Sequence, residues 1–172
     1  MTQRPSFIVD VPVVYWGFDG RPHHGTLQVH KSLAPNVRAI FFELYRRRFP
    51  IGSIKTYHQI KNHPRHMRVK HSIGWRPSKR QSDRKTKSHH AYGVAIDINP
   101  PQNPFISKTR TIPEGAVYDP TAQGAVTWEI VKIFKDHGFD WGGDWQGLKD
   151  YMHFSYARCD RLVQGLKPER SK

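Results

Sequence analysis

The sequence predicts one domain that mixes β-strands with α-helices. Its 172 residues suffice for a single hydrophobic core. Residues 7–18 are rich in Val, Ile, Tyr and Trp, and a turn signal at Asp19-Gly20 joins them to a second strand over residues 25–30. Residues 34–48 carry apolar side chains at helical spacing, with Pro35 in the first turn. We therefore expect a hairpin followed by an amphipathic helix.

The rest of the chain continues the mixture, with no repeat and no linker. Val94, Ile96 and Ile98 alternate with other residues, which predicts a half-buried strand. A second helix is expected to begin at Asp119-Pro120 and to stop at Gly138. The other expected segments are a weak strand at 51–60, a basic irregular stretch at 61–87, a proline-rich loop at 100–113, an aromatic turn at 139–145, a final strand at 151–156 and a basic tail at 158–172.

Charge and cysteine content limit the classes of function. Lysine and arginine number 28 against 14 acids, for a net charge of +14. Such a charge favours polyanions, namely nucleic acid, a membrane surface or an anionic cell wall, although solubility explains charge alone equally well. The single cysteine, Cys159, excludes an intramolecular disulfide and a thiolate metal cluster.

The N-terminal segment does not have the pattern of an export signal. Its apolar run is interrupted by Asp10 and Pro12, and no run in the chain approaches membrane-spanning length. We expect the protein to be made and kept in the cytoplasm unless something else releases it.

A candidate metal site begins in the segment SHHAYGVAIDINP. Asp97 sits within the expected strand, where a carboxylate is costly unless a cationic group meets it. A turn near Gly93 would let His90 and Asp97 point at one centre. His153, in the last expected strand, is a third candidate ligand, and a hydrolytic zinc site needs three protein ligands and one open position.

Two further residues supply the remaining chemistry. Asp150, three residues before His153, is placed to act as the general base for an attacking water. Arg76 offers a positive donor to a developing oxyanion or a substrate carboxylate. Simpler interpretations stay open, because a lone His153 is more often a satisfied core residue and Asp97 could pair with an arginine.

These residues carry a resemblance to a known family. Ser88-x-His90-x-x-Gly93-x-Ala95-x-Asp97 resembles the SxHxxGxAxD signature of the zinc D-alanyl-D-alanine carboxypeptidases (VanY-like) and L-alanyl-D-glutamate endopeptidases. Asp150-x-x-His153 resembles their second signature. The segments WGGDW, DYMHF and DINPPQNPF, and the helix ending RRFP, resemble the branch that contains phage endolysins.

The resemblance implies the role of each site residue. It implies zinc as cofactor, with His90, Asp97 and His153 as its ligands and Asp150 as general base. Arg76 is the expected substrate-binding and catalytic arginine, with Arg80 and Arg84 as fallback candidates. We also expect Ser88, Tyr92 and Trp145 to contact substrate.

The resemblance also implies an architecture and a setting. The expected fold is a small α+β domain, an antiparallel sheet flanked by helices, of Hedgehog or D,D-peptidase type. We expect a zinc peptidase domain over residues 1–157, a basic tail over 158–172 and a monomer. Position 89, often acidic in relatives, is His89 here. A chain without an export signal resembles a phage endolysin that a holin releases to act on the wall.

Three functions remain in competition. The first is L-alanyl-D-glutamate endopeptidase activity on peptidoglycan, with D,D-carboxypeptidase or dipeptidase activity as a close rival. The third is a non-catalytic basic module that binds the wall or nucleic acid, although no nucleic-acid reading motif is present. The basic run Arg46 to Arg48 is more often a solvated helix end, yet together with tail lysines it is also a hypothetical wall-targeting group.

Overall fold

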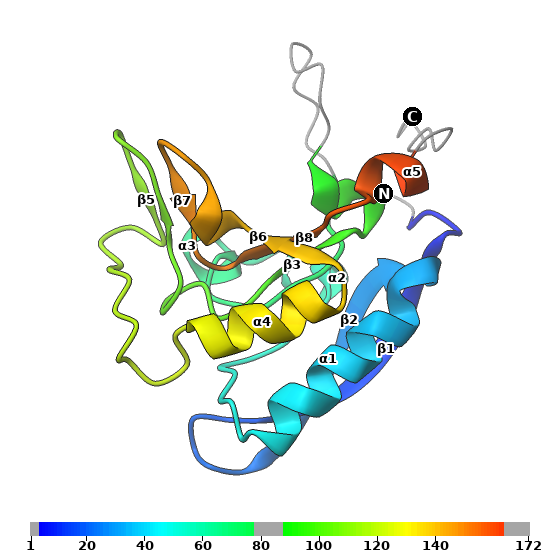
Figure 1. Ribbon diagram of the computed structural model, residues 1–172, viewed down its shortest axis with the longest axis horizontal. Helices are drawn as coiled ribbons and strands as arrows, with labels where there is room; N and C mark the ends of the chain where they lie inside the picture. The colour runs from blue at the N-terminus through cyan, green and yellow to red at the C-terminus, as the bar shows by residue number, and fades with distance from the viewer. Residues whose placement is uncertain (1–3, 78–87, 164–172) are drawn as a thin grey trace.

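The N-terminal half of the protein is built on a long hairpin with a helix packed across it. The structure, a computed structural model, describes residues 4–77 and 88–163. Strand β1 (Ile8–Trp16) pairs antiparallel with β2 (Pro22–His30), so β2 begins earlier than the sequence suggested. A short 3-10 helix, η1 (Lys31–Leu33), leads into α1 (Ala34–Arg46), which runs back along β1 (Figure 1).

Short elements follow and carry the candidate site. A second sheet has the order β3-β8-β6 and a third has the order β5-β4-β7, both antiparallel. The elements in chain order are α2 (Tyr57–Ile60), α3 (Arg65–Arg68), η2 (His89–Tyr92), β3 (Ala95–Asp97), β4 (Phe105–Ile106), β5 (Thr111–Ile112), α4 (Trp128–Asp136), β6 (Phe139–Trp141), η3 (Gly142–Asp144), β7 (Lys149–Asp150), β8 (His153–Tyr156) and α5 (Cys159–Val163). No helix in these described ranges is long and apolar enough to cross a membrane.

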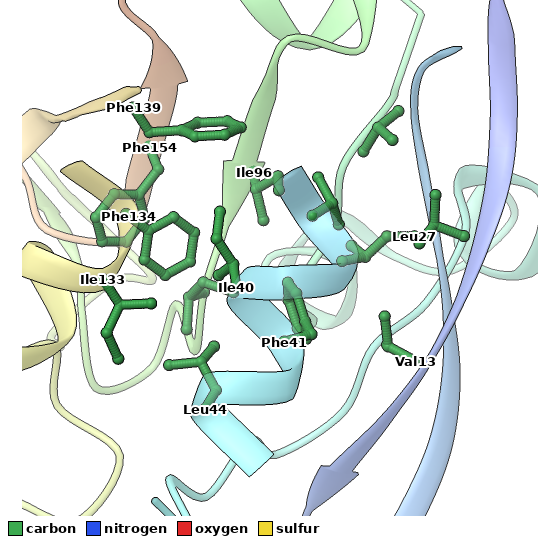
Figure 2. Close-up of a cluster of buried hydrophobic side chains, with 14 of the residues drawn as sticks. Val13, Leu27, Ile40, Phe41, Leu44, Ile96, Ile133, Phe134, Phe139 and Phe154 are labelled. Carbon is green, nitrogen blue, oxygen red and sulfur yellow. The ribbon is translucent and has the colours of Figure 1, made fainter. Parts of the chain in front are cut away.

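The core lies between the two longer helices and the sheets. Helix α4 packs Phe134 face to face against Phe154 of β8, with ring centroids 3.7 Å apart. Ile40 and Leu44 of α1 approach the same cluster from the other side (Figure 2). Burying such large side chains supplies the main favourable free energy of folding. The expectation of an α+β domain with antiparallel strands and flanking helices is confirmed.

Several boundaries predicted from the sequence are wrong. Residues 51–60 form no strand beyond an isolated bridge from Ile54 to Ser72, and they end in helix α2. The loop expected at 100–113 contains the β4–β5 hairpin. The strand around Ile96 is buried on both faces, because Asp97 on its second face is covered by His90 and His153.

The helices also differ from expectation at their ends. Helix α4 begins at Trp128 and not at Asp119, because the Asp119 carboxylate accepts hydrogen bonds from Thr121 and closes a local turn. Gly124 then adopts a left-handed conformation, with φ of 81°. Helix α1 stops at Arg46, two residues before the predicted end.

Residues 72–75, here called the linking segment, join the first sheet to the second. The amide of Trp75 donates to the carbonyl of Gln28 in β2 at 2.6 Å. Ile73 exchanges two backbone hydrogen bonds with Asp97 of β3, at 2.9 and 3.1 Å. The linking segment therefore fixes the position of β3 relative to the hairpin. It lies inside the stretch that the sequence showed only as basic and irregular.

Candidate metal centre and active site

Three side chains from distant parts of the chain converge in the interior. Nε2 of His90 lies 3.1 Å from Oδ1 of Asp97 and 3.3 Å from Nδ1 of His153. Nδ1 of His153 lies 3.0 Å from the same carboxylate oxygen. All three residues are buried, with exposed fractions of 1%, 8% and 8%. The structure thus brings together the three residues that the sequence nominated as metal ligands.

Local backbone geometry explains why they meet. Helix η2 ends at Gly93, whose φ of 67° turns the chain sharply into β3. That turn directs His90 back toward Asp97, seven residues later. Strand β3 pairs with β8 so that Asp97 stands directly opposite His153. The turn and the strand pairing together set the geometry of the cluster.

The linking segment determines which nitrogen of His90 faces the centre. Nδ1 of His90 lies 2.6 Å from the backbone carbonyl of Gly74. A carbonyl only accepts, so Nδ1 carries the proton and donates it. Nε2 therefore presents a lone pair to Asp97 and His153. Such a backbone partner is typical of metal-binding histidines, because it fixes both the tautomer and the ring orientation.

The resulting electrostatics call for a cation. Burial lowers the pKa of His90, which favours the neutral imidazole. Burial alone would raise the pKa of Asp97, but the adjacent His90 and His153 outweigh it and hold that pKa well below its usual value. An ionised carboxylate and a nitrogen lone pair thus face one point at hydrogen-bonding distance. Two imidazoles and one carboxylate form a donor set that holds a transition-metal ion, so this group could bind a metal.

Asp150 lies on β7 beside this cluster. Its Oδ1 is buried and finds no hydrogen-bond partner within residues 4–77 and 88–163. Burial, reinforced by the negative charge of Asp97, raises the pKa of Asp150 to about 7, against the opposing charges of His153 and Arg76. A carboxyl group with a pKa near neutrality can both take up and release a proton under ordinary conditions.

Gly142 of η3 allows Asp150 to sit so close. A Cβ atom added to Gly142 would lie 2.5 Å from the backbone oxygen of Asp150 and 2.9 Å from its Cβ. Any larger residue would push β7 away. Asp150 is held from the other side by pairing with Phe105 of β4. Gly142 in the WGGDW segment thus has a positional role that the sequence did not reveal.

Arg76 is exposed and directly follows the linking segment. Its backbone amide donates to the carbonyl of His90 at 3.4 Å, and the preceding Trp75 is buried, with its indole N–H donating to Ala91. The positive charge of Arg76 adds to the lowering of the pKa of His90 and partly offsets the rise in the pKa of Asp150. The guanidinium charge of Arg76 therefore influences the protonation of both His90 and Asp150. The fallback candidates Arg80 and Arg84 lie outside the described residues.

The other expected substrate contacts differ in how they lie relative to the metal-ligand cluster. Trp145 is 37% exposed, and its ring centroid lies 5.4 Å from that of His153, so it borders the cluster. Ser88 is exposed, and its carbonyl accepts from Ala91 in η2. Tyr92 packs against the hydrophobic core. The position of Trp145 suits a substrate contact, whereas that of Tyr92 suits packing.

Sequence reasoning missed other residues around the site. His89 is exposed, yet its ring lies near that of His153, with centroids 6.5 Å apart, and its Nε2 lies 3.7 Å from Sγ of Cys159. Gly74 contributes through its carbonyl, which no side-chain pattern can indicate. The glycine at 142 was visible only as part of a turn. Position 89, which departs from relatives, was the one available signal.

Comparison with known proteins agrees with this geometry. Residues 82–156 match the family described as D-alanyl-D-alanine carboxypeptidase. Over these residues the chain is similar to this peptidase family. It is also 41% identical over 68 residues to the peptidoglycan L-alanyl-D-glutamate endopeptidase CwlK of Bacillus subtilis (strain 168). The aligned part is 39% of this chain and spans 38% of the length of that relative.

We predict that the cluster binds one divalent ion and is stabilised by it. At a free zinc concentration about 100 times the dissociation constant, folding should gain about 2.7 kcal/mol, since the ion binds the folded state. Thermal unfolding with and without zinc measures this gain. His153→Ala should abolish it, whereas His24→Ala, at an exposed position, should retain it. Equal stabilisation of both variants would contradict the assignment.

We predict a definite pH dependence for the metal-free protein. The folded-state pKa of Asp150, about 7, lies above the ordinary value of about 3.9, so the contribution of Asp150 to stability falls as pH rises from about 4 to about 7. The free energy of unfolding of Asp150→Asn, minus that of the wild type, should therefore increase across this window in chelator-treated samples. Urea unfolding at several pH values measures it.

Asp119→Asn provides a control of opposite sign. Hydrogen bonds from Thr121 lower the pKa of Asp119, so its contribution is present above the ordinary pKa and is lost as pH falls. The corresponding difference should decrease with rising pH. If Asp150→Asn followed the trend of Asp119→Asn, the raised pKa of Asp150 would be refuted.

Proposed function

We propose that the protein is a zinc-dependent peptidase that cleaves the peptide stem of peptidoglycan, with the bond between L-alanine and D-glutamate as its substrate. The observation that carries the proposal is the meeting of His90, Asp97 and His153 beside Asp150, whose buried Oδ1 has no hydrogen-bond partner among the described residues. The printed activity of the CwlK relative supports the choice of bond, and the family match supports the class of enzyme.

Each residue has a role in the proposed reaction. His90, Asp97 and His153 would hold the zinc ion. When bound, zinc would activate a water molecule and polarise the scissile carbonyl group. Asp150 would accept the proton of the attacking water and return it to the amine of the leaving residue, for which a pKa of about 7 is well suited.

The surrounding residues would orient the substrate. The guanidinium of Arg76 would face the carbonyl oxygen as negative charge develops on it, or would bind a stem carboxylate. Trp145, beside His153, would contact the stem peptide and exclude water from one side of the site. Ser88 and Tyr92 are proposed as further substrate contacts.

A second candidate activity is the D-alanyl-D-alanine carboxypeptidase reaction that the family description names. Removal of the terminal D-alanine would use the same metal and the same base, and would differ only in which bond reaches them. An arginine that binds a free C-terminal carboxylate would favour this carboxypeptidase activity. The two activities release different products, so one experiment separates them.

Finer proposals follow from the same family likeness. We propose a Hedgehog or D,D-peptidase type of fold, a peptidase domain over residues 1–157 and a basic tail over 158–172. We propose further that the protein acts as a monomer on the cell wall, in the manner of an endolysin. The antiparallel sheet β3-β8-β6, which carries Asp97 and His153 at neighbouring positions, supports the fold proposal.

We predict cleavage of defined soluble muropeptides by the purified protein. Mass spectrometry should show separation between L-alanine and D-glutamate, abolished by a chelator and restored by zinc. Release of terminal D-alanine instead would support the carboxypeptidase alternative. Asp150→Ala should lower the rate by a factor of about 10² to 10⁴, the usual contribution of a general base. Chelator-resistant cleavage, or full activity without Asp150, would refute the mechanism.

We predict that Gly142→Ala uncouples metal binding from catalysis. The added methyl group would displace Asp150, and a misplacement of about 1 Å can cost about 10²-fold in rate. Zinc affinity should change little, because the three ligands lie on other elements. Gly52→Ala is the control, since its added Cβ would meet only Phe18, at an ordinary 3.6 Å. Equal rates for the two variants would show that Gly142 does not position Asp150.

A further inference from the structure

The C-terminal end of α1 presents three consecutive arginines to solvent. The side chains of Arg46 and Arg47 are 64% and 53% exposed, and Arg48 is also exposed. This end of α1 lies beside the turn between β1 and β2, at the bottom of the molecule, away from η2 and α5 (Figure 1). The arginines are therefore remote from the candidate active site and have no part in its chemistry.

The backbone at Arg48 is one that usually favours glycine. The amide of Phe49 donates to the carbonyl of Leu44, and that of Arg48 donates to Tyr45, which together close the helix in a Schellman motif. Arg48 occupies the left-handed position of this motif, with φ of 52°. A side chain there costs backbone energy that glycine would avoid. A long cationic residue at this position therefore needs a compensating interaction.

Aromatic rings support two of the three guanidinium groups. Arg48 lies over the ring of Trp16, 4.9 Å from its centroid, and Arg46 lies 6.0 Å from the centroid of Phe42. Trp16 is itself fixed, because it stacks on Tyr45 and its indole N–H donates to the Tyr45 carbonyl. A guanidinium stacked on a ring keeps its N–H edges free for a planar or tetrahedral anion.

The charge of this surface is incompletely neutralised. Within the described ranges, Glu43 is the one carboxylate within 4.0 Å of these guanidinium groups, at 3.5 Å from Arg46 and 4.0 Å from Arg47. Exposed ion pairs of this length are weak and readily exchanged. Phe42 beside them is 62% exposed, an unusual position for a large apolar side chain. The combination of stacked arginines and an exposed aromatic ring is typical of a binding surface for anionic groups.

We propose that this surface, formed by Trp16, Phe42 and Arg46 to Arg48 and here called the arginine end of α1, binds a phosphodiester-linked polymer of the cell wall. Repeated phosphate groups would each accept paired N–H donors from an arginine. The choice of a wall polymer over other polyanions rests on the proposed function, which places the substrate in the wall. Binding at this surface would hold the enzyme near its substrate while leaving the active site free.

The test measures binding without requiring cleavage. Chelator-treated protein is sedimented with purified walls at low salt, and with walls from which phosphodiester polymers have been removed. The triple variant Arg46→Gln, Arg47→Gln, Arg48→Gln should bind intact walls about tenfold more weakly, as expected for three exposed charge contacts. The control triple Arg65→Gln, Lys70→Gln, Lys108→Gln removes the same charge from other exposed positions and should bind as the wild type.

A single substitution separates binding from folding. Arg48→Gly relieves the left-handed backbone but removes one guanidinium, so its unfolding temperature should stay within about 4 °C of the wild type while wall binding weakens. All variants should cleave soluble muropeptides at the wild-type rate, which distinguishes failure here from failure of the proposed function. Equal weakening by both triples, undiminished binding to stripped walls, or equal affinity for DNA or anionic lipid vesicles would each overturn the proposal.

Discussion

A carboxylate buried between two imidazoles is the interaction on which the rest of the structure depends. Asp97 is held ionised by its neighbours, and the single N–H group of neutral His90 donates to the carbonyl of Gly74. The carboxylate of Asp97 and a lone pair of His90 therefore face each other inside the protein, which is unfavourable without a cation. The fold holds this arrangement in advance, so that an ion entering the site would complete it.

Most of the surrounding architecture can be understood as support for that cluster. The linking segment ties the hairpin to β3 and delivers the Gly74 carbonyl. Asn99 and Asn103, buried just after β3, hold the following loop by hydrogen bonds to backbone groups, including the carbonyl of Gly124. The two-residue strand β7 is too short to be stable alone, and its position is fixed by Gly142 and by β4. Rigid placement of short elements is what a site of this kind requires.

The sequence predicted the cluster better than it predicted the elements that support it. The three converging residues and Asp150 belong to two short motifs, each recognisable by its own spacing. One motif contains the tight turn at Gly93, and the long-range pairing of β3 with β8 brings the two motifs together. The carbonyl of Gly74 and the close approach at Gly142 depend on backbone atoms and long-range packing, which leave no side-chain pattern. The start of α4 was misplaced because the capping preference of Asp119 serves a turn as well as a helix.

The central claim is that His90, Asp97 and His153 hold a single metal ion through the atoms that already converge. Crystals of the zinc-loaded protein, measured by anomalous diffraction at the zinc absorption edge, test this most directly. We expect one strong peak at about 2.0–2.2 Å from Nε2 of His90, a carboxylate oxygen of Asp97 and Nδ1 of His153, with Gly74 still accepting from Nδ1 of His90. A peak at any other group of residues, or no peak at full zinc loading, would contradict the account.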